Sequence, residues 1–218
     1  MVEEEDQISM RRRLLLPKLF RVWNTLIKMM KDRGYSLEER REKLDYNGWV
    51  DEFQNKLISQ IFYKVIKENP PHVKRIYFEY REPIKSNGKI NSKDIEEFYS
   101  NLQKALSESG VILISDILTS QAKQKIIDYN AEIQIQCFTL NELIVNITEH
   151  TYVPQHILLN EEEKRKLLER YRIKESQLPK ILTTDAIAKY LGLRKGNVVK
   201  IIRDSETAGK YVTYRITV

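Results

Sequence analysis

The chain has 218 residues, of which 41% are hydrophobic and 31% charged, and its formal net charge is +6. These values predict a soluble globular protein of one large domain or two small ones, for which nucleic-acid contact is possible but not required. No apolar run reaches the length of a membrane span, so we expect an intracellular protein, and the single Cys137 excludes an intramolecular disulfide and a multi-cysteine zinc site.

A long helix is predicted near the N-terminus. Residues 1–10 lack apolar periodicity, and we expect them to be frayed. From Leu16 onward, apolar residues recur three and four positions apart. This spacing predicts a helix with Pro17 in its first turn and Gly34 as its C-terminal cap.

The next segment is less regular. Ser36 and Glu39 form a capping box for a short second helix, and Asn47 and Gly48 mark a break after it. Apolar residues then return at helical spacing, and residues 61–65 alternate well enough to form a strand.

From residue 73 onward, predicted strands and helices alternate regularly. The strands cover residues 76–80, 111–115 and 132–138, and each is followed by a helix, the first of which should close at Gly110. The run at 111–115 is wholly apolar, which is typical of a strand buried on both faces of a parallel sheet. This order predicts a mainly parallel three-layer α/β domain over residues 1–147, with right-handed crossovers.

Residues 148–218 predict a second, small α+β domain with a mixed sheet. A short strand at 156–159 precedes a helix capped by Asn160 and Glu163, and a further helix begins at Thr183 or Thr184 and ends at Gly192. The closing residues 198–218 alternate with period two around a polar connection in which Gly209 supplies a positive φ, so they predict a β-hairpin.

The last third also holds the excess of positive charge. Residues 150–218 contain 14 of the 37 Lys and Arg residues and 8 of the 31 Asp and Glu residues, so the whole net charge of +6 lies there. A basic, solvated surface explains this excess as well as an acidic partner surface or a nearby phosphate backbone does.

Specific stretches of this region carry a resemblance to a known family. They read YVPQHILL at 152–159, LLERYRIKESQLPKI at 167–181 and YLGLRKGNVVKIIRDSETAGKYVTYRI at 190–216. Together they resemble the C-terminal assembly domain of the fifth common subunit of the nuclear RNA polymerases I, II and III, a domain that is similar to a small component of the archaeal RNA polymerase. The run VWNTLIKMMKDRGY at 22–35 resembles the opening helix of the same nuclear subunit.

This resemblance implies a non-catalytic structural subunit in the nucleus. Its C-terminal domain would dock on the largest polymerase subunit and anchor the N-terminal domain, which would project as part of the lower jaw near downstream duplex DNA. The resemblance also implies that the jaw domain is similar to a nuclease fold that lacks its catalytic apparatus. An alternative is a free-standing DNA-processing enzyme of nuclease-like fold, and a third option is an adaptor that binds an unrelated complex.

The residues themselves give little support to catalysis. His72, His150 and His156 have no metal-ligand spacing, and no phosphate-binding glycine loop or nucleophile elbow occurs, so we expect no cofactor, metal or small-molecule ligand. A restriction-nuclease-like site would need an Asp and a Glu-x-Lys on adjacent strands. Asp116 could supply the first, but Gln134 stands where the lysine is required.

The loop at 119–125 is the best candidate for a DNA contact. It follows the buried strand and opens a helix whose free N–H groups can meet a phosphate. Its candidate residues are Thr119, Ser120, Gln121, Ala122, Lys123 and Lys125. The matching family loop reads Thr-Pro-Ser-Ala, whereas here Ser120 replaces the proline and Gln121 the serine, so a proline wedge is missing. An ordinary helix cap with exposed lysines is the alternative.

A second set of residues is the candidate assembly surface. Its members lie around the proline bend and the end of the last helix: Leu178, Pro179, Tyr190, Leu191, Gly192, Arg194 and Lys195. A helix end, a cap and a turn would explain the same residues without any partner. We expect any DNA contact of the protein to be sequence-independent and made through phosphates.

Overall fold

The computed structural model describes residues 2–35, 44–53, 64–66, 75–80, 91–103, 109–114, 118–129, 134–205, 207 and 209–218. The chain divides into two compact units, Met1–Val145 and Asn146–Val218. The predicted helix that begins at Ser36 and most of the predicted strand at 61–65 lie outside the described residues. The described part of the chain contains no helix long and apolar enough to cross a membrane.

The first helix, α1, covers Val2–Asp32, so the predictions of a frayed start and of Pro17 in the first turn are wrong. Residues 10–16 are Met, Arg and Leu, all strong helix formers, and they continue the helix N-terminal to Pro17 although the proline lacks the N–H of that turn. The predicted cap is confirmed. Gly34 has a φ of 78°, and Tyr35 N donates to Met30 O over 2.9 Å.

The second described helix, α3 (Tyr46–Phe53), corrects the predicted break at Asn47 and Gly48, because both residues lie inside it. The helix begins after Asp45, whose Oδ1 accepts from Gly48 N over 2.9 Å. A Cβ at Gly48 would lie 2.9 Å from the same oxygen, so the glycine allows this close approach. Trp49 is buried and its ring lies 5.7 Å from that of Phe20 in α1.

The sheet of the N-terminal unit is mainly parallel, as predicted. Its order is β1 (Lys64–Ile66), β2 (Arg75–Tyr80), β3 (Ser109–Ile114) and β4 (Gln134–Phe138), and only the β1–β2 pair is antiparallel. The prediction that Gly110 ends a helix is wrong, because Gly110 lies in β3 opposite Ile76 and Gln134. Pairing of the whole apolar strand with both neighbours fixes this residue.

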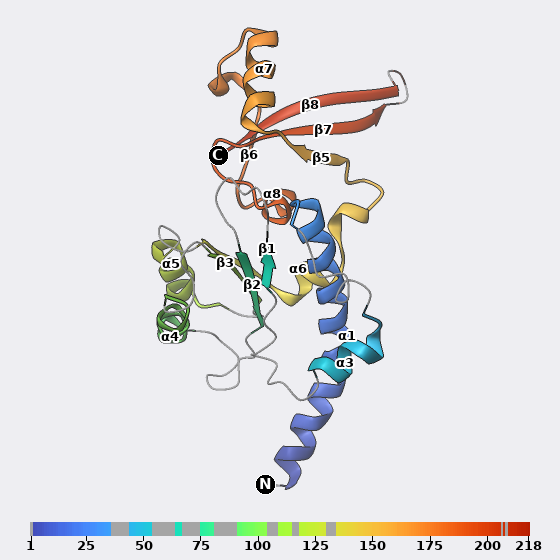
Figure 1. Cartoon of the computed structure of the whole chain (residues 1–218), viewed down its shortest axis with the longest axis vertical. Coiled ribbons are helices and arrows are strands. Elements are labelled where there is room, and N and C mark those ends of the chain that lie inside the picture. Colours follow the sequence, from blue (N-terminus) through green and yellow to red (C-terminus); the bar gives the residue numbers. More distant parts are fainter. Residues whose placement is uncertain are drawn as a thin grey trace. The chain divides into compact units, whose positions relative to one another are not determined.

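Helices lie on both sides of this sheet. Figure 1 shows α4 (Ser92–Gln103) and α5 (Ser120–Tyr129) on one side and α1 on the other, and α1 packs against α6 (Leu140–Ile144). The unit therefore has the predicted three layers. The capping box of α6 is also confirmed: Thr139 Oγ1 accepts from Glu142 N, and the Glu142 carboxylate accepts from Thr139 N.

The C-terminal unit has the predicted mixed sheet, in the order β5 (Gln155–Leu158), β7 (Val198–Ser205), β8 (Gly209–Thr217) and β6 (Lys180–Ile181). The β6–β8 pair is parallel and the other two pairs are antiparallel. The unit also contains α7 (Glu161–Tyr171), α8 (Ala186–Leu191) and the 3-10 helices η2 (Ile147–Glu149) and η3 (Glu175–Gln177).

The caps of these helices are local and mostly as predicted. Asn160 and Glu163 form the capping box of α7, and Gly192 ends α8 with a φ of 66°. The start of α8 differs by one or two residues, because the N-cap is Asp185 rather than Thr183 or Thr184. The Asp185 carboxylate accepts from both Ile187 N and Ala188 N, which a single threonine hydroxyl at the preceding positions would not do.

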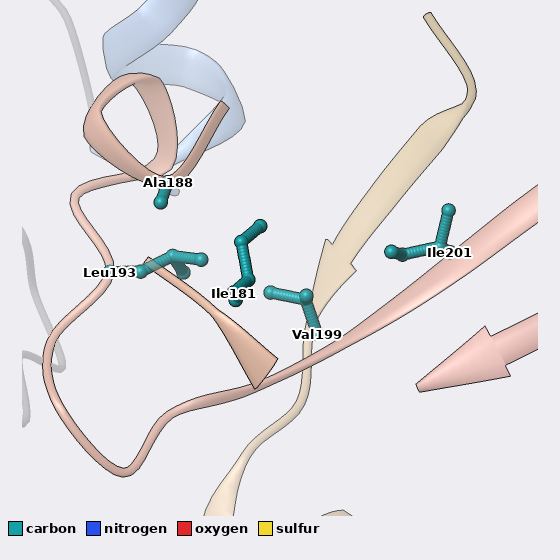
Figure 2. Close-up of a cluster of buried hydrophobic side chains, with 5 residues drawn as sticks. All are labelled: Ile181, Ala188, Leu193, Val199 and Ile201. Atoms are coloured by element: carbon teal, nitrogen blue, oxygen red, sulfur yellow. The ribbon is translucent and has the colours of Figure 1, made fainter. Parts of the chain in front are cut away.

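The first half of strand β7 is buried on both faces. On one face Val198 packs with Ile216 of β8, with Leu167 of α7 and with Leu178. On the other face Val199 and Ile201 form a cluster with Ile181, Ala188 and Leu193, and Figure 2 shows Val199 and Ile201 projecting from β7 and Ala188 and Leu193 lying near Ile181. The strand therefore joins two apolar clusters into one unit.

We predict that Ile201→Ala lowers the free energy of unfolding of the C-terminal unit by about 2–5 kcal/mol. The Ile201 side chain is only 1% exposed, so its truncation leaves a cavity in the core. Amide hydrogen exchange of β7 and β8 in the full-length chain would measure this loss. Ile157→Ala in β5 is the control, since that side chain is 38% exposed and should cost much less. Equal losses in the two variants would contradict the assignment of β7 as the central buried strand.

Candidate functional site

The N-terminus of α5 forms where the sequence predicts it. Thr119 Oγ1 accepts from Ala122 N over 3.2 Å, which makes Thr119 the N-cap. Ala122 is fully buried and holds this end of the helix against the unit, whereas Ser120 and Gln121 are exposed. The predicted DNA-facing loop therefore contains a buried residue, Ala122, and an exposed polar rim that consists of Ser120, Gln121 and Lys123.

The two lysines of this loop have different surroundings. Lys125 Nζ lies 2.6 Å from Glu96 Oε1 of α4, and this hydrogen bond and the Glu96 charge raise the pKa of Lys125. The same ammonium lies 5.8 Å from the ring centroid of Tyr129, which stacks on Tyr99 at 3.9 Å. Lys125 therefore braces α5 against α4. Lys123 is exposed and has no ion-pair partner within the described residues, so it is the more available cation.

Of the residues named for a nuclease-like site, the structure describes Gln134. Asp116 and Glu132 lie outside the described residues, and Gln134 begins β4 opposite Gly110 of β3. A glutamine side chain is uncharged at this position, where a restriction-nuclease-like site requires a lysine. Where the structure is described, no three His, Cys, Asp or Glu residues gather into a group that could hold a metal ion.

His150 and His156, the two histidines that the structure describes, have different surroundings. His150 is exposed, and its ring lies 5.6 Å from that of Tyr152. His156 is half-buried in β5, with Nδ1 2.7 Å from Pro154 O. Burial lowers the pKa of His156 from its ordinary value, against the raising effects of the Pro154 carbonyl and Asp185, and the nearby charges of Arg203 and Arg215 add smaller lowering effects. The third histidine of the chain, His72, lies outside the described residues.

The predicted assembly residues fall into a buried set and an exposed set. Leu178 and Tyr190 are buried, and Leu191 is partly buried against the cluster around Val199. Gly192 caps α8, which its positive φ explains without a partner. Pro179, Arg194 and Lys195 remain at least partly exposed, so the possible contacts of this surface reduce to these three residues and their neighbours.

Hydrogen bonds fix the turn that carries Arg194 and Lys195. Asn197 Oδ1 accepts from Arg194 N over 2.7 Å, and Gly196 N donates to Thr217 O over 2.9 Å. Lys164 Nζ of α7 donates to Gly196 O over 3.0 Å and lies 2.9 Å from Glu175 Oε1. Sequence reasoning missed Lys164, because a lysine within a charged helix gives no sign of a partner 32 residues away.

Family models match both parts of the chain. The model described as RNA polymerase Rpb5, C-terminal domain, matches residues 145–217. The model described as RNA polymerase Rpb5, N-terminal domain, matches residues 15–102. The first match covers every strand of the C-terminal sheet.

Curated relatives extend this similarity over nearly the whole chain. DNA-directed RNA polymerases I, II, and III subunit RPABC1 of Caenorhabditis elegans is 36% identical over 208 residues, which cover 92% of this chain and 96% of the relative. The protein of the same name from Dictyostelium discoideum is 36% identical over 203 residues, with 92% and 98% covered. DNA-directed RNA polymerase subunit 5-like protein 1 of Arabidopsis thaliana is 32% identical over 206 residues, with 93% and 97% covered.

We predict that His156 makes the C-terminal unit less stable in acid. Because the folded-state pKa of His156 lies below 6.5, the unfolded chain binds more protons as the pH falls through about 6.5, and the free energy of unfolding decreases. Urea unfolding of the full-length chain between about pH 7.5 and 5 measures this decrease. His156→Gln should show a smaller decrease than the unchanged chain. An unaltered pH dependence in His156→Gln would refute the assignment.

Proposed function

The chain belongs to the RNA polymerase Rpb5 family, and from this we propose that it is a non-catalytic structural subunit shared by the DNA-dependent RNA polymerases I, II and III. The observation that carries the proposal is the extent of the similarity. The match to the relatives named as a subunit of all three polymerases covers 96% and 98% of their length, so both units of this chain have counterparts in them.

The two units have different roles in this proposal. The C-terminal domain, residues 148–218, holds the chain to the largest subunit and to other polymerase subunits, and its excess of positive charge favours acidic partner surfaces. The N-terminal domain, residues 1–147, forms part of the lower jaw near downstream DNA and has an inactive, nuclease-like fold. The protein acts in the nucleus. The names of the relatives and Gln134 in β4 give no support to the nuclease alternative.

The proposed DNA contact lies at the exposed rim of α5. Ser120 and Gln121 offer uncharged hydrogen-bonding groups and Lys123 offers a charge, a combination that suits phosphates better than base edges. Such a contact is weak, sensitive to salt and independent of sequence. Lys125 contributes mainly to the position of the helix, because Glu96 already neutralises it.

Affinity purification of the tagged full-length chain from its own cells, followed by mass spectrometry, tests the proposed function. We expect the largest subunits of all three polymerases to be recovered together with the chain. A chain with the same tag at the same expression level but with Ile201→Asp, which places a charge in the core, should recover none of them. Recovery of one unrelated complex in place of the polymerases would support the adaptor instead.

The DNA contact predicts a difference between the two lysines. Polymerase that contains Lys123→Ala should bind downstream duplex with a slope of log affinity against log salt that is smaller by about 0.9, the value for one lost phosphate contact. Lys125→Ala is the matched control and should leave this slope nearly unchanged, because Lys125 pairs with Glu96. Fluorescence anisotropy with labelled duplex at several salt concentrations gives both slopes. Unchanged slopes for both variants would exclude a phosphate contact at this rim.

A further inference from the structure

One face of the C-terminal sheet carries Arg203 and Arg215. Among the described residues, neither arginine forms an ion pair with an acidic side chain. In the β7–β8 ladder, Arg203 is opposite Tyr211 and Arg215 is opposite Val199. In the β5–β7 ladder, His156 is opposite Ile201. Directly opposed residues point to the same side of a sheet, and so do alternate residues of one strand. The two arginines, His156 and Tyr211 therefore lie on the face that α8 covers at Val199 and Ile201.

Part of this face is open. Tyr211 is 57% exposed and Leu158, on the same face of β5, is 43% exposed. Arg203 is exposed and Arg215 is half-buried. The exposure of Arg203 and Tyr211 follows from the sheet in Figure 1, where β7 and β8 continue beyond the end of β5, which pairs with β7 only from Val199 to Ile202. We call the residues His156, Leu158, Arg203, Tyr211 and Arg215 the basic face.

His156 lies between the two arginines of the basic face, because Arg215 is opposite Val199 and His156 is opposite Ile201, both of which precede Arg203 on β7. The charges of Arg203 and Arg215 both act on His156, whose pKa is lowered first by burial and then, against the raising effects of Pro154 and Asp185, by these two side chains. Asp185 is the acidic group near His156, but its Oδ1 already accepts from Ile187 N and Ala188 N at the start of α8. The described residues thus leave the guanidinium groups without a carboxylate.

The opposite face of the same hairpin carries two lysines and one acidic residue. There Asp204 is opposite Lys210, and Lys200 is opposite Tyr214. Both strands thus carry cations on each side, but the arginines lie on one side and the lysines on the other. This separation of residue types indicates different surroundings for the two faces.

We propose that the basic face binds an acidic, extended segment of another polymerase subunit, with carboxylates on Arg203 and Arg215 and an apolar side chain against Tyr211 and Leu158. The inference rests on the proposed function and adds a surface outside the predicted assembly residues. A planar guanidinium binds a carboxylate through two hydrogen bonds, and a half-buried arginine gains most from this pairing.

The residue types favour a protein partner over nucleic acid. Tyr and Arg are enriched in protein interfaces and Lys is depleted there, and no strand residue that the structure describes on this face is a lysine. A phosphate backbone is instead tracked by many mobile, exposed cations. Half-burial of Arg215 and His156 beside apolar residues suits a side chain that enters from a docked chain.

Charge reversal on the two faces tests this proposal. The dissociation constant of the full-length chain is measured against purified RNA polymerase II that lacks this subunit. We expect Arg203→Glu to raise it at least about tenfold, as expected when a docked charge pair becomes a repulsion. Lys200→Glu makes the same change of charge on the opposite face and should alter it less than about twofold. Equal effects of the two variants would overturn the proposal.

A photo-crosslinker identifies what covers the face. With p-benzoylphenylalanine introduced at the position of Tyr211, we expect an adduct with an Asp- or Glu-rich peptide of a polymerase subunit. The same group at the position of Val212, the next residue and therefore on the opposite face, should give much less of it. An adduct with nucleic acid, or adducts only from position 212, would refute the proposal.

The two proposals fail in different ways. If the unchanged chain does not join the polymerase at all, the proposed function is wrong. If the unchanged chain joins and Arg203→Glu joins equally well, only the assignment of the basic face is wrong. Circular dichroism of each variant verifies that the exposed substitution at Arg203 leaves the fold intact.

Discussion

Burial of the first half of β7 on both of its faces is the constraint on which the C-terminal unit depends. Val198 and Val199 are consecutive, point to opposite sides and are 1% and 0% exposed. Val198 contributes to the cluster that holds Leu167 of α7, and Val199 to the cluster that holds Ala188 of α8, so both helices pack on this strand. On the face of β7 that packs against α8, Val199 and Ile201 are buried, and the next residue on that face, Arg203, is exposed. Arg203 therefore lies toward the projecting end of the hairpin, whereas Arg215 lies opposite Val199, beside the buried cluster.

Sequence reasoning succeeded where the determining contacts are local. The capping boxes at Thr139 and Asn160 depend on residues three positions apart, and the structure contains both. The alternation of the closing hairpin likewise predicts its two strands. The predictions at Pro17 and Gly110 were wrong, because proline often begins a helix and glycine often ends one, and the neighbouring residues were not taken into account. Strong helix formers before Pro17 extend α1, and pairing on both sides holds Gly110 within β3.

The surfaces were harder to predict, because they depend on contacts between distant residues. The two lysines of the 119–125 loop look alike in the sequence, yet Glu96, 29 positions before Lys125, neutralises only that one. Leu178 and Tyr190 carry part of the family resemblance but are buried, so their role in this structure is packing. The basic face requires the register of β5 on β7 as well as that of the hairpin, since His156 and Arg203 are 47 positions apart. Period-two patterning gives the alternation of each strand but not this register.

Cryo-electron microscopy of the RNA polymerase isolated through a tag on this chain would test the central claim most directly, namely that the C-terminal unit holds the protein to the enzyme. The account predicts that residues 146–218 are well ordered against the largest subunit, with β7 and β8 at the interface, and that the N-terminal unit is more mobile and lies near the downstream DNA. Density in which the N-terminal unit makes the main contact with the enzyme, while the C-terminal sheet is free in solvent, would contradict it.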